Sequence, residues 1–583
     1  MTQPVSKNQR IHLRAEDLTQ QGAGVGHYNG FAVFVPGMLP EEEGEVLIVQ
    51  VKKQYAYGKL LELTAASLDR VEPSCPYFPR CGGCLLQHMT YEAQLRWKQK
   101  QVYELLRRVG GVTLDVYPPI LGMAPEERLY YRNKAQFPVR MEDGKLEAGF
   151  YAPRSHRLIP IDACRIQSEV SNRLLPQILR LCMEAGVTAY DETTGKGLLR
   201  HILIRDGRES GEVLVCFVIN GQKLPKEKEL AQALQQLGVT SVSVNTNTQN
   251  TNVILGAKTR TIGGPEQIRA YIGDLEFRIS PQSFFQVNPI QTRRLYETAL
   301  EMAALTGTET VWDAYCGAGT ISLFLARKAR HVYGVEIIDA AIQDARQNAC
   351  NNGISNVTFF TGEAEKVIPE HYRKTGIRPD VIVVDPPRAG CDAALLDTIL
   401  QMAPERMVYV SCDPGTLARD VKILENGGMK VRKVQCLDMF PETGHVETVC
   451  LLSKLHEAKH HVNVRLDMDE MDLTAAESKA TYEEMKKYVA EHNVGMKVSN
   501  LYIAQIKQKH GIIERENYNK PKSEKGGQPE CPKEKEIAIE EALKYFQMIP
   551  IMLLSLRTLG IKPDVRRLFV YRKNFHGYNK HDI

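Results

Sequence analysis

Two motifs in the second half of the chain carry side chains that could do covalent chemistry. Cys412 lies in MVYVSCDPGTLARD, directly after an apolar run typical of a buried strand. We expect a helix to begin just after it, so the helix dipole and the nearby Arg419 would favour the thiolate, the reactive form of cysteine. Glu447 and His445 lie in DMFPETGHVETVC, and a carboxylate near Cys412 could act as a general base. Most single cysteines are inert packing, but a place at the end of a strand favours a nucleophile.

A glycine-containing motif, DAYCGAGT at residues 313–320, follows another strand-like run and precedes the helical ISLFLARKA. Its glycines let the backbone turn tightly beside a ligand, and the N-terminus of the following helix adds its dipole. The next strand-like run, HVYGVEI, contains Glu336, which could accept hydrogen bonds from both ribose hydroxyls of an adenosine. Ser322 interrupts the G-x-G-x-x-G pattern of dinucleotide-binding loops, which favours S-adenosylmethionine.

A third motif, VIVVDPPRAG at residues 381–390, places Asp385 at the C-terminal end of a buried strand. Open α/β sheets bind their ligands at that end of the strands. The two prolines that follow cannot continue the hydrogen-bond ladder and hold an extended loop beside the site. Asp385 could therefore orient a base or a ribose.

Three cysteines lie close together in PSCPYFPRCGGCLLQH, namely Cys75, Cys81 and Cys84, and Cys164 in IDACRIQ is a candidate fourth ligand. Structural zinc sites usually use paired C-x2-C motifs. A clustered triplet with one distant cysteine fits an iron–sulfur cluster held by four thiolates better. Spacing alone leaves both metals open and favours iron.

The elements expected around these motifs divide the chain into four parts. Residues 1–68 contain short strand-like runs separated by glycines, which predicts a small β-barrel. Residues 69–280 mix strand-like and helical runs, including a basic amphipathic helix in TYEAQLRWKQKQVYELLRRVG. Residues 281–455 alternate strands and helices, which is typical of a doubly wound α/β domain, so the fold class is α/β.

In the predicted barrel, Lys52, Lys53 and Lys59 are interleaved with Tyr55 and Tyr57. On one face of a barrel this mixture suits single-stranded nucleic acid, because bases stack on the rings and lysines meet the phosphates. A solvated strand edge explains the pattern equally well.

The fourth part, residues 456–583, differs in character from the rest. It predicts two helices joined by a short turn, a linker rich in Pro, Lys and Glu, another helix and a basic end. A helix-turn-helix nucleic-acid binder is the sharper interpretation of the helix pair. A helical extension without that role is the interpretation that we prefer.

Composition limits the classes of function. The 583 residues carry a formal net charge of +4, so the chain would bind nucleic acid only through local patches. No apolar run reaches the roughly 18 residues of a membrane span, and the N-terminus lacks the apolar region of a secretory signal. We therefore expect a cytoplasmic protein with no membrane partner, whose 13 cysteines stay mostly reduced.

Taken in this order, the motifs make the chain resemble the RNA uracil-C5-methyltransferases, in particular the branch that acts on 23S ribosomal RNA. The resemblance runs from about residue 8 to 455 and includes a barrel that looks like a TRAM domain, which is OB-like. Further matching segments are YRNKAQF at 131–137 and SFFQVN at 283–288. The tRNA-specific branch typically lacks the barrel and the cysteine cluster, so their presence favours ribosomal RNA.

The resemblance implies a role for each candidate residue. Cys412 would be the nucleophile and Glu447 the general base. The contacts to S-adenosylmethionine would come from Gln286, Tyr315, Glu336 and Asp385. The ligands of a [4Fe–4S] cluster would be Cys75, Cys81, Cys84 and Cys164. The substrate would be a uridine flipped out of 23S rRNA, and we expect a monomer.

Three alternatives stay open. The same chemistry could act on a tRNA uridine. A non-catalytic RNA-binding or assembly factor could keep the fold, although such a protein needs neither Cys412 nor Glu447. A DNA cytosine-C5 methyltransferase also uses a cysteine nucleophile, but commonly in a Pro-Cys pair, and here Ser411 precedes Cys412.

Overall fold

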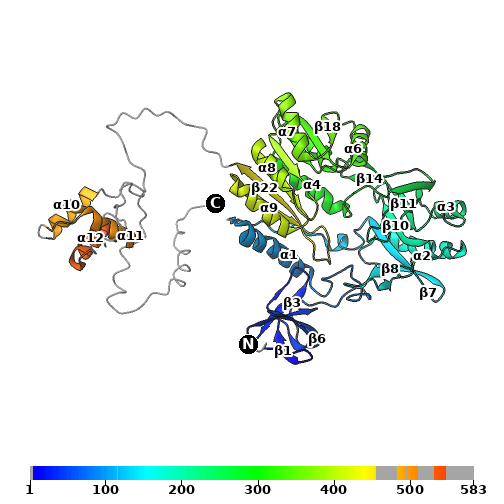
Figure 1. Ribbon diagram of the computed structural model, residues 1–583, viewed down its shortest axis with the longest axis horizontal. Coiled ribbons are helices and arrows are strands. Elements are labelled where there is room, and N and C mark those ends of the chain that lie inside the picture. The colour runs from blue at the N-terminus through cyan, green and yellow to red at the C-terminus, as the bar shows by residue number, and fades with distance from the viewer. Residues whose placement is uncertain (1–3, 115, 455–481, 494–495, 510–530, 546–583) are drawn as a thin grey trace, which may run out of the picture. The chain divides into compact units, whose positions relative to one another are not determined.

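The computed structural model describes residues 4–114, 116–454, 482–493, 496–509 and 531–545. The chain divides into two compact units, Met1–Glu457 and Ala458–Ile583. The first unit contains three large sheets and a two-stranded hairpin (Figure 1). Within the described residues, no helix is long and apolar enough to cross a membrane.

The N-terminal sheet is a small barrel, as predicted. Its strands are β1 (Arg10–Arg14), β2 (Asp17–Leu18), β3 (Ala23–Tyr28), β4 (Phe31–Pro36), β5 (Glu43–Val51) and β6 (Tyr55–Ala65), in the order β1-β5-β6-β4-β3-β2. Alternate residues such as Val33, Val35, Val46 and Ile48 are fully buried, so one face of each strand forms the core. β1 also approaches β3, and a Cβ at Gly26 would meet the Arg14 carbonyl oxygen at 2.1 Å, so only glycine fits there.

The central sheet has seven strands in the order β13-β12-β11-β10-β7-β8-β9. They are β7 (Lys134–Glu142), β8 (Lys145–Tyr151), β9 (Leu158–Pro160), β10 (Leu199–Asp206), β11 (Val213–Ile219), β12 (Ser241–Thr246) and β13 (Lys258–Gly263). Helices α2 (Glu169–Glu184) and α3 (Glu227–Gln236) share one apolar core with it. Every residue of β10 and β11 is buried, because both faces of the sheet are covered.

The C-terminal sheet of the first unit has the order β18-β17-β16-β19-β20-β22-β21. Its strands are β16 (Thr310–Ala314), β17 (His331–Glu336), β18 (Val357–Thr361), β19 (Val381–Val384), β20 (Arg406–Ser411), β21 (Met429–Leu437) and β22 (Glu447–Lys454). The pairs among β16 to β20 are parallel, and β22 runs antiparallel to both of its neighbours. This confirms the predicted doubly wound α/β domain.

Alternate strand residues of this sheet face two different helical layers. In β19, Val381 and Val383 join a core with helices α4 (Pro289–Ala303), α5 (Thr320–Ala326) and α6 (Asp339–Asn351). Ile382 and Val384 join a second core with α7 (Ala364–Thr375), α8 (Ala393–Met402) and α9 (Pro414–Asn426). Burial on both faces explains why these strands are continuous apolar runs in the sequence.

Two segments that precede residue 281 also pack into this domain. The predicted basic helix is α1 (Tyr91–Leu105), which continues as a π-helical turn, Leu106–Gly110, and packs against α9. The hairpin of β14 (Ile268–Ile272) and β15 (Leu275–Ile279) shares the core of α4 and α5. The cores of the molecule are therefore built from pieces of chain that are not consecutive.

A segment between α1 and the short 3-10 helix Pro125–Glu127 runs along β21, the outermost strand of the C-terminal sheet. Leu121 donates its N–H to the Cys436 carbonyl at 2.9 Å and accepts from the Asp438 N–H at 3.0 Å. The Gln435 amide donates to the Pro119 carbonyl at 2.8 Å. These contacts pair part of the outer edge of the sheet.

In the second unit the structure describes three helices, α10 (Tyr482–His492), α11 (Asn500–Lys509) and α12 (Lys533–Tyr545). They bury a small apolar core that includes Met485, Ile503 and Leu543. The predicted helix pair falls on α10 and α11. The start of that prediction, before residue 482, the predicted linker NKPKSEKGGQPECPKEKE as far as residue 530, and the basic end lie outside the described residues. The last four residues of that predicted linker, Lys533–Glu536, form the first turn of α12 instead.

Candidate active site

The carboxyl edge of the C-terminal sheet gathers the candidate residues. Tyr315 directly follows β16, Glu336 is the last residue of β17, Asp385 follows β19 and Cys412 follows β20. Because these strands are parallel, their last residues lie along one edge. The strand pattern in the sequence is therefore sufficient to bring these side chains to one region.

Glu447 reaches the same edge from the opposite chain direction. β22 begins at Glu447 and runs antiparallel to β20, with Ser411 paired to Thr448. One step further along this register, Cys412 stands across from Glu447. The hydrogen-bond ladder thus juxtaposes a thiol and a carboxyl group.

A cavity of about 1590 Å³ opens at this edge. Its lining includes Cys412, Glu447, Asp385 and Gln286, and it extends to all four cysteines of the predicted cluster. Tyr315 and Glu336 are not among the lining residues. The structure therefore brings eight of the ten candidate residues to one cavity.

Tyr315 and Glu336 lie at the glycine-containing turn instead. The Glu336 carboxylate accepts hydrogen bonds from the N–H groups of Gly317 at 3.2 Å and Ile338 at 3.1 Å. The Tyr315 hydroxyl accepts from the Asp392 N–H at 3.4 Å. Gly317 and Gly319 have φ values of 54° and 79°, in the left-handed region that glycine adopts without strain.

The serine that interrupts the dinucleotide pattern has a structural role in this turn. Ser322 donates its hydroxyl to the buried Asp313 carboxylate at 2.5 Å. Burial raises the pKa of Asp313 to about 7, although the bond from Ser322 acts in the opposite direction. Asp313, in β16, thus holds the first turn of α5 against the sheet.

Burial dominates the electrostatics around the thiol. It raises the pKa of Cys412 to about 11, the negative charges of Glu447 and Asp385 add to this, and Arg388 lowers it. Burial also raises the pKa of Asp385 to about 7 and that of Glu447 well above its usual value. A cation placed among these groups would stabilise the thiolate and both carboxylates.

The expected help from Arg419 is not observed. Its guanidinium donates to Asp420 at 2.8 Å through Nε and to the Ala389 carbonyl at 2.9 Å. Asp420 is fully buried and also accepts from Tyr409, so it holds Arg419 in a separate network. Arg388, which the sequence analysis did not single out, is the arginine that acts on Cys412.

The four cysteines of the predicted cluster are all half-buried free thiols. Cys81 interacts electrostatically with Cys75, and Cys84 with Cys164 and Cys81, so the four thiols form one group. The Gly83 N–H donates to the Cys81 sulfur at 3.4 Å. In the part of the chain that the structure describes, no three His, Cys, Asp or Glu side chains are arranged to hold a single metal ion.

Comparison with known families decides the class of protein. The profile of the family "tRNA (Uracil-5-)-methyltransferase" matches residues 90–455, which is more than half of the chain. The chain belongs to this family. A second profile, that of the TRAM domain, matches residues 4–61 and coincides with the N-terminal barrel. The protein is thus an RNA uracil-C5-methyltransferase with a TRAM domain.

Relatives of this methyltransferase extend over most of the first unit. An uncharacterized RNA methyltransferase of Halalkalibacterium halodurans is 52% identical over 451 residues, 77% of this chain and 98% of the relative. One from Clostridium tetani is 47% identical over 458 residues, 78% of this chain and 99% of the relative. The crystal structure of Pyrococcus abyssi tRNA (uracil-54, C5)-methyltransferase with S-adenosyl-L-homocysteine is similar with a TM-score of 0.60 and 26% identity. That match covers 76% of this chain and 100% of the P. abyssi chain.

Two residues that line the methyltransferase cavity were missed by the sequence analysis. Arg388 follows Asp385 and the two prolines, and its signal was a basic residue in a loop at a strand end. Phe284 is 72% exposed although it is a large apolar side chain. Its place two residues before Gln286 was the available signal.

Proposed function

We propose that the protein transfers a methyl group from S-adenosylmethionine to C5 of a uridine in 23S rRNA through a covalent adduct with Cys412. The observation that carries this proposal is the register of β20 and β22, whose last pair, Ser411 with Thr448, directly precedes Cys412 and follows Glu447, and both of these residues line a large cavity. A non-catalytic RNA binder needs neither residue.

The chemistry explains the need for both groups. Uracil C5 is too weak a nucleophile to attack a methyl sulfonium unaided. The Cys412 thiolate adds to C6, and the electron pair released to C5 takes the methyl group, with S-adenosylhomocysteine as the leaving group. Glu447 then removes the C5 proton, the C5–C6 double bond forms again and the thiolate leaves.

The raised pKa of Cys412 has a consequence for the first step. In the free enzyme the thiol is protonated at neutral pH, since burial raises its pKa to about 11. The positive sulfonium of S-adenosylmethionine would favour the thiolate and the ionised forms of Asp385 and Glu447. We expect Gln286, Tyr315, Glu336 and Asp385 to contact that substrate. The bound S-adenosyl-L-homocysteine named for the P. abyssi neighbour supports this class of ligand.

A [4Fe–4S] cluster on Cys75, Cys81, Cys84 and Cys164 belongs to the same proposal. The donor set fits, because all four free thiols line the cavity and the Cys81 sulfur already accepts a backbone hydrogen bond. The four thiolates would together hold the iron atoms of the cluster. The cluster would brace the segment between the barrel and α1.

Basic and aromatic groups suit the cavity and the barrel for RNA. The arginines that line the cavity are Arg70, Arg132, Arg154, Arg165 and Arg388. On the barrel the rings of Phe34, Tyr55 and Tyr57 lie 5.4–5.9 Å apart by their centroids. Phosphates would meet the arginines, and unpaired bases would stack on rings of this kind.

A tRNA uridine is the second candidate substrate, because of the P. abyssi neighbour. That protein is a tRNA (uracil-54, C5)-methyltransferase, and the match to it covers 76% of this chain. Ribosomal and transfer RNA therefore have to be tested side by side.

The deciding experiment measures methyl transfer from labelled S-adenosylmethionine to unmodified 23S rRNA and to bulk tRNA, side by side. Mass spectrometry identifies the product nucleoside. We expect 5-methyluridine in the ribosomal RNA alone. Label in tRNA alone would keep the chemistry and refute the substrate, and no label in either RNA would favour the non-catalytic alternative.

A further inference from the structure

The loop between β21 and β22 leads directly into the general base. Leu437, the last residue of β21, pairs with Glu447, the first residue of β22. Residues 438–446 form the loop that joins them, and Phe440, Thr443 and His445 of this loop line the cavity. Any change in the path of this loop would therefore move Glu447 or the cavity wall beside it.

Five successive carbonyl oxygens of this loop, those of residues 438 to 442, each accept a hydrogen bond from elsewhere in the molecule. The donors, which we call the carbonyl clamp, are in loop order Gln291 at 2.9 Å, Asn288 at 2.9 Å, Lys98 at 3.0 Å, Tyr131 at 3.1 Å, and the N–H groups of Leu85 at 2.8 Å and Leu86 at 3.0 Å. These hydrogen bonds hold the backbone at each of the first five positions of the loop.

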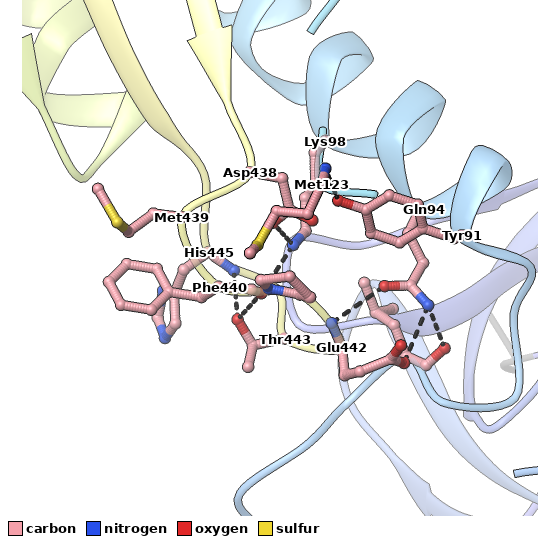
Figure 2. A network of polar contacts seen from close by, with 12 residues as sticks. Tyr91, Gln94, Lys98, Met123, Asp438, Met439, Phe440, Glu442, Thr443 and His445 are labelled. Atoms are coloured by element: carbon pink, nitrogen blue, oxygen red, sulfur yellow. Dashed lines mark hydrogen bonds and ion pairs between the residues drawn. The ribbon is translucent and has the colours of Figure 1, made fainter. Parts of the chain in front are cut away.

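Lys98 is the charged member of the clamp. Its side chain and that of Asp438 are both fully buried, and its Nζ donates to Asp438 at 2.6 Å as well as to the Phe440 carbonyl. One turn earlier on α1, Gln94 exchanges two hydrogen bonds with Glu442, at 3.0 Å to its carboxylate and at 3.1 Å from its N–H. Figure 2 shows Gln94 and Lys98 on the same face of α1, directed at the loop.

The loop is held in a conformation that it would not favour by itself. Glu442 has φ of 69°, in the left-handed region that residues other than glycine seldom adopt. A Cβ at Gly444 would meet Leu85 at 3.0 Å and the Gln20 carbonyl at 3.3 Å. Such a conformation persists only where the surroundings determine it, and such places are often functional sites.

We propose that Lys98 is a positioning residue, which sets the orientation of Glu447 for removal of the C5 proton by fixing Asp438 and the Phe440 carbonyl. The proposal rests on the proposed function, since it needs Glu447 to be the base. A buried ion pair is a poor means of stabilising a fold, because apolar residues of similar size often do as well or better. Such a pair does fix the orientation of its two side chains. Here it fixes Asp438, the residue next to Leu437, which is the strand partner of Glu447.

The test uses full-length enzyme and RNA with either protium or deuterium at C5 of the target uridine. Lys98→Met removes the ammonium group. Asp438→Asn removes the negative charge of its ion-pair partner and keeps the shape of that side chain. We expect kcat to fall about 10–100-fold in both variants, as for a misplacement of about 1 Å, with KM for RNA changed less than twofold. The kinetic isotope effect should rise toward that of Glu447→Gln, and the RNA–protein adduct should accumulate on denaturing gels.

The matched control is Lys100→Met. Lys100 lies on the same helix and makes an exposed ion pair with Asp17, with side chains 51% and 43% exposed. We expect wild-type kcat and the wild-type isotope effect from this variant. The control separates the loss of any α1 lysine from the loss of the one that holds the loop.

A purely structural role would give a different result. Lys98→Met and Asp438→Asn would then lower Tm and the fraction of active enzyme, with a wild-type isotope effect and no extra adduct, and the proposal would be wrong. If Lys98→Met does not fold, the isosteric Asp438→Asn decides by the same readouts. If Glu447→Gln itself shows neither adduct nor isotope effect, the assignment of the base fails, which is a separate failure.

Discussion

Cys412 and the four cysteines Cys75, Cys81, Cys84 and Cys164 line one cavity but are positioned in different ways. Cys412 follows a central strand, and the ladder of β20 with β22 determines what stands opposite it. The other four lie in irregular segments, held by isolated bonds such as that from the Gly82 N–H to the Tyr151 carbonyl at 2.9 Å. The hydrogen bonds between strands are sufficient to position Cys412. The four cysteines in irregular segments would be positioned more firmly by a ligand that binds all of them.

Removal of the Cys412 thiol should produce the largest effect. We expect Cys412→Ala to slow methyl transfer by about 10⁴-fold or more, because the covalent step is lost. Iron content and affinity for S-adenosylmethionine should stay near normal, since the ladder rather than the thiol holds this edge. Radiolabel transfer and equilibrium dialysis measure the two quantities, and a loss of binding would mean that Cys412 is structural.

Loss of the base should follow in size. Glu447→Gln should slow turnover by about 10²–10⁴-fold, the usual range for general-base catalysis. The methylated uracil should stay attached to Cys412, because the thiolate leaves only after the C5 proton. A denaturing gel that shows no RNA–protein adduct would argue against Glu447 as the base.

The protonation state of Cys412 should differ from that of an ordinary exposed cysteine. Its pKa is raised to about 11, so the thiol is protonated at neutral pH and the thiolate fraction grows as pH rises. Alkylation of Cys412 in the free enzyme should therefore accelerate about 100-fold from pH 7 to pH 9, tenfold for each unit. Peptide mass spectrometry follows this residue alone, and a rate that levels off by pH 8 would show a lower pKa.

The four-cysteine group should show the smallest effect on rate and the largest on metal content. Anaerobically purified protein should be brown, with about four irons per chain. Cys84→Ser should remove the iron. It should slow methyl transfer about fivefold, since loosening Leu85 and Leu86 weakens about one hydrogen bond of the clamp, worth roughly 1 kcal/mol.

A matched variant makes this measurement specific. Cys350 is exposed on α6, away from the cavity lining, so Cys350→Ser should change neither iron nor rate. Stoichiometric zinc without iron in the wild type would refute the cluster. If Cys84→Ser slowed methyl transfer as much as Cys412→Ala, the distinction between the nucleophilic cysteine and the four cluster cysteines would be wrong.

The sequence predicted the strand-end residues because parallel strands align their ends, so that a motif after each apolar run must reach a common edge. The predicted effect of Arg419 on the Cys412 thiolate was wrong, because the buried Asp420 accepts a hydrogen bond from that guanidinium. The sequence does not show this contact. The contact of Lys98 with the loop could not be predicted from the sequence either. A lysine on an amphipathic helix normally faces solvent, and its partner Asp438 lies 340 residues away.

The segment that pairs with β21 has a consequence for solubility. An uncovered outer strand offers unpaired N–H and C=O groups to any other extended chain, which promotes aggregation. Here Leu121 pairs with the Cys436 carbonyl of β21 and with the Asp438 N–H just beyond the strand, and the Gln435 side chain donates to the Pro119 carbonyl. The covering segment itself contains Pro118 and Pro119, which have no N–H to offer, so it ends the sheet instead of extending it to another molecule.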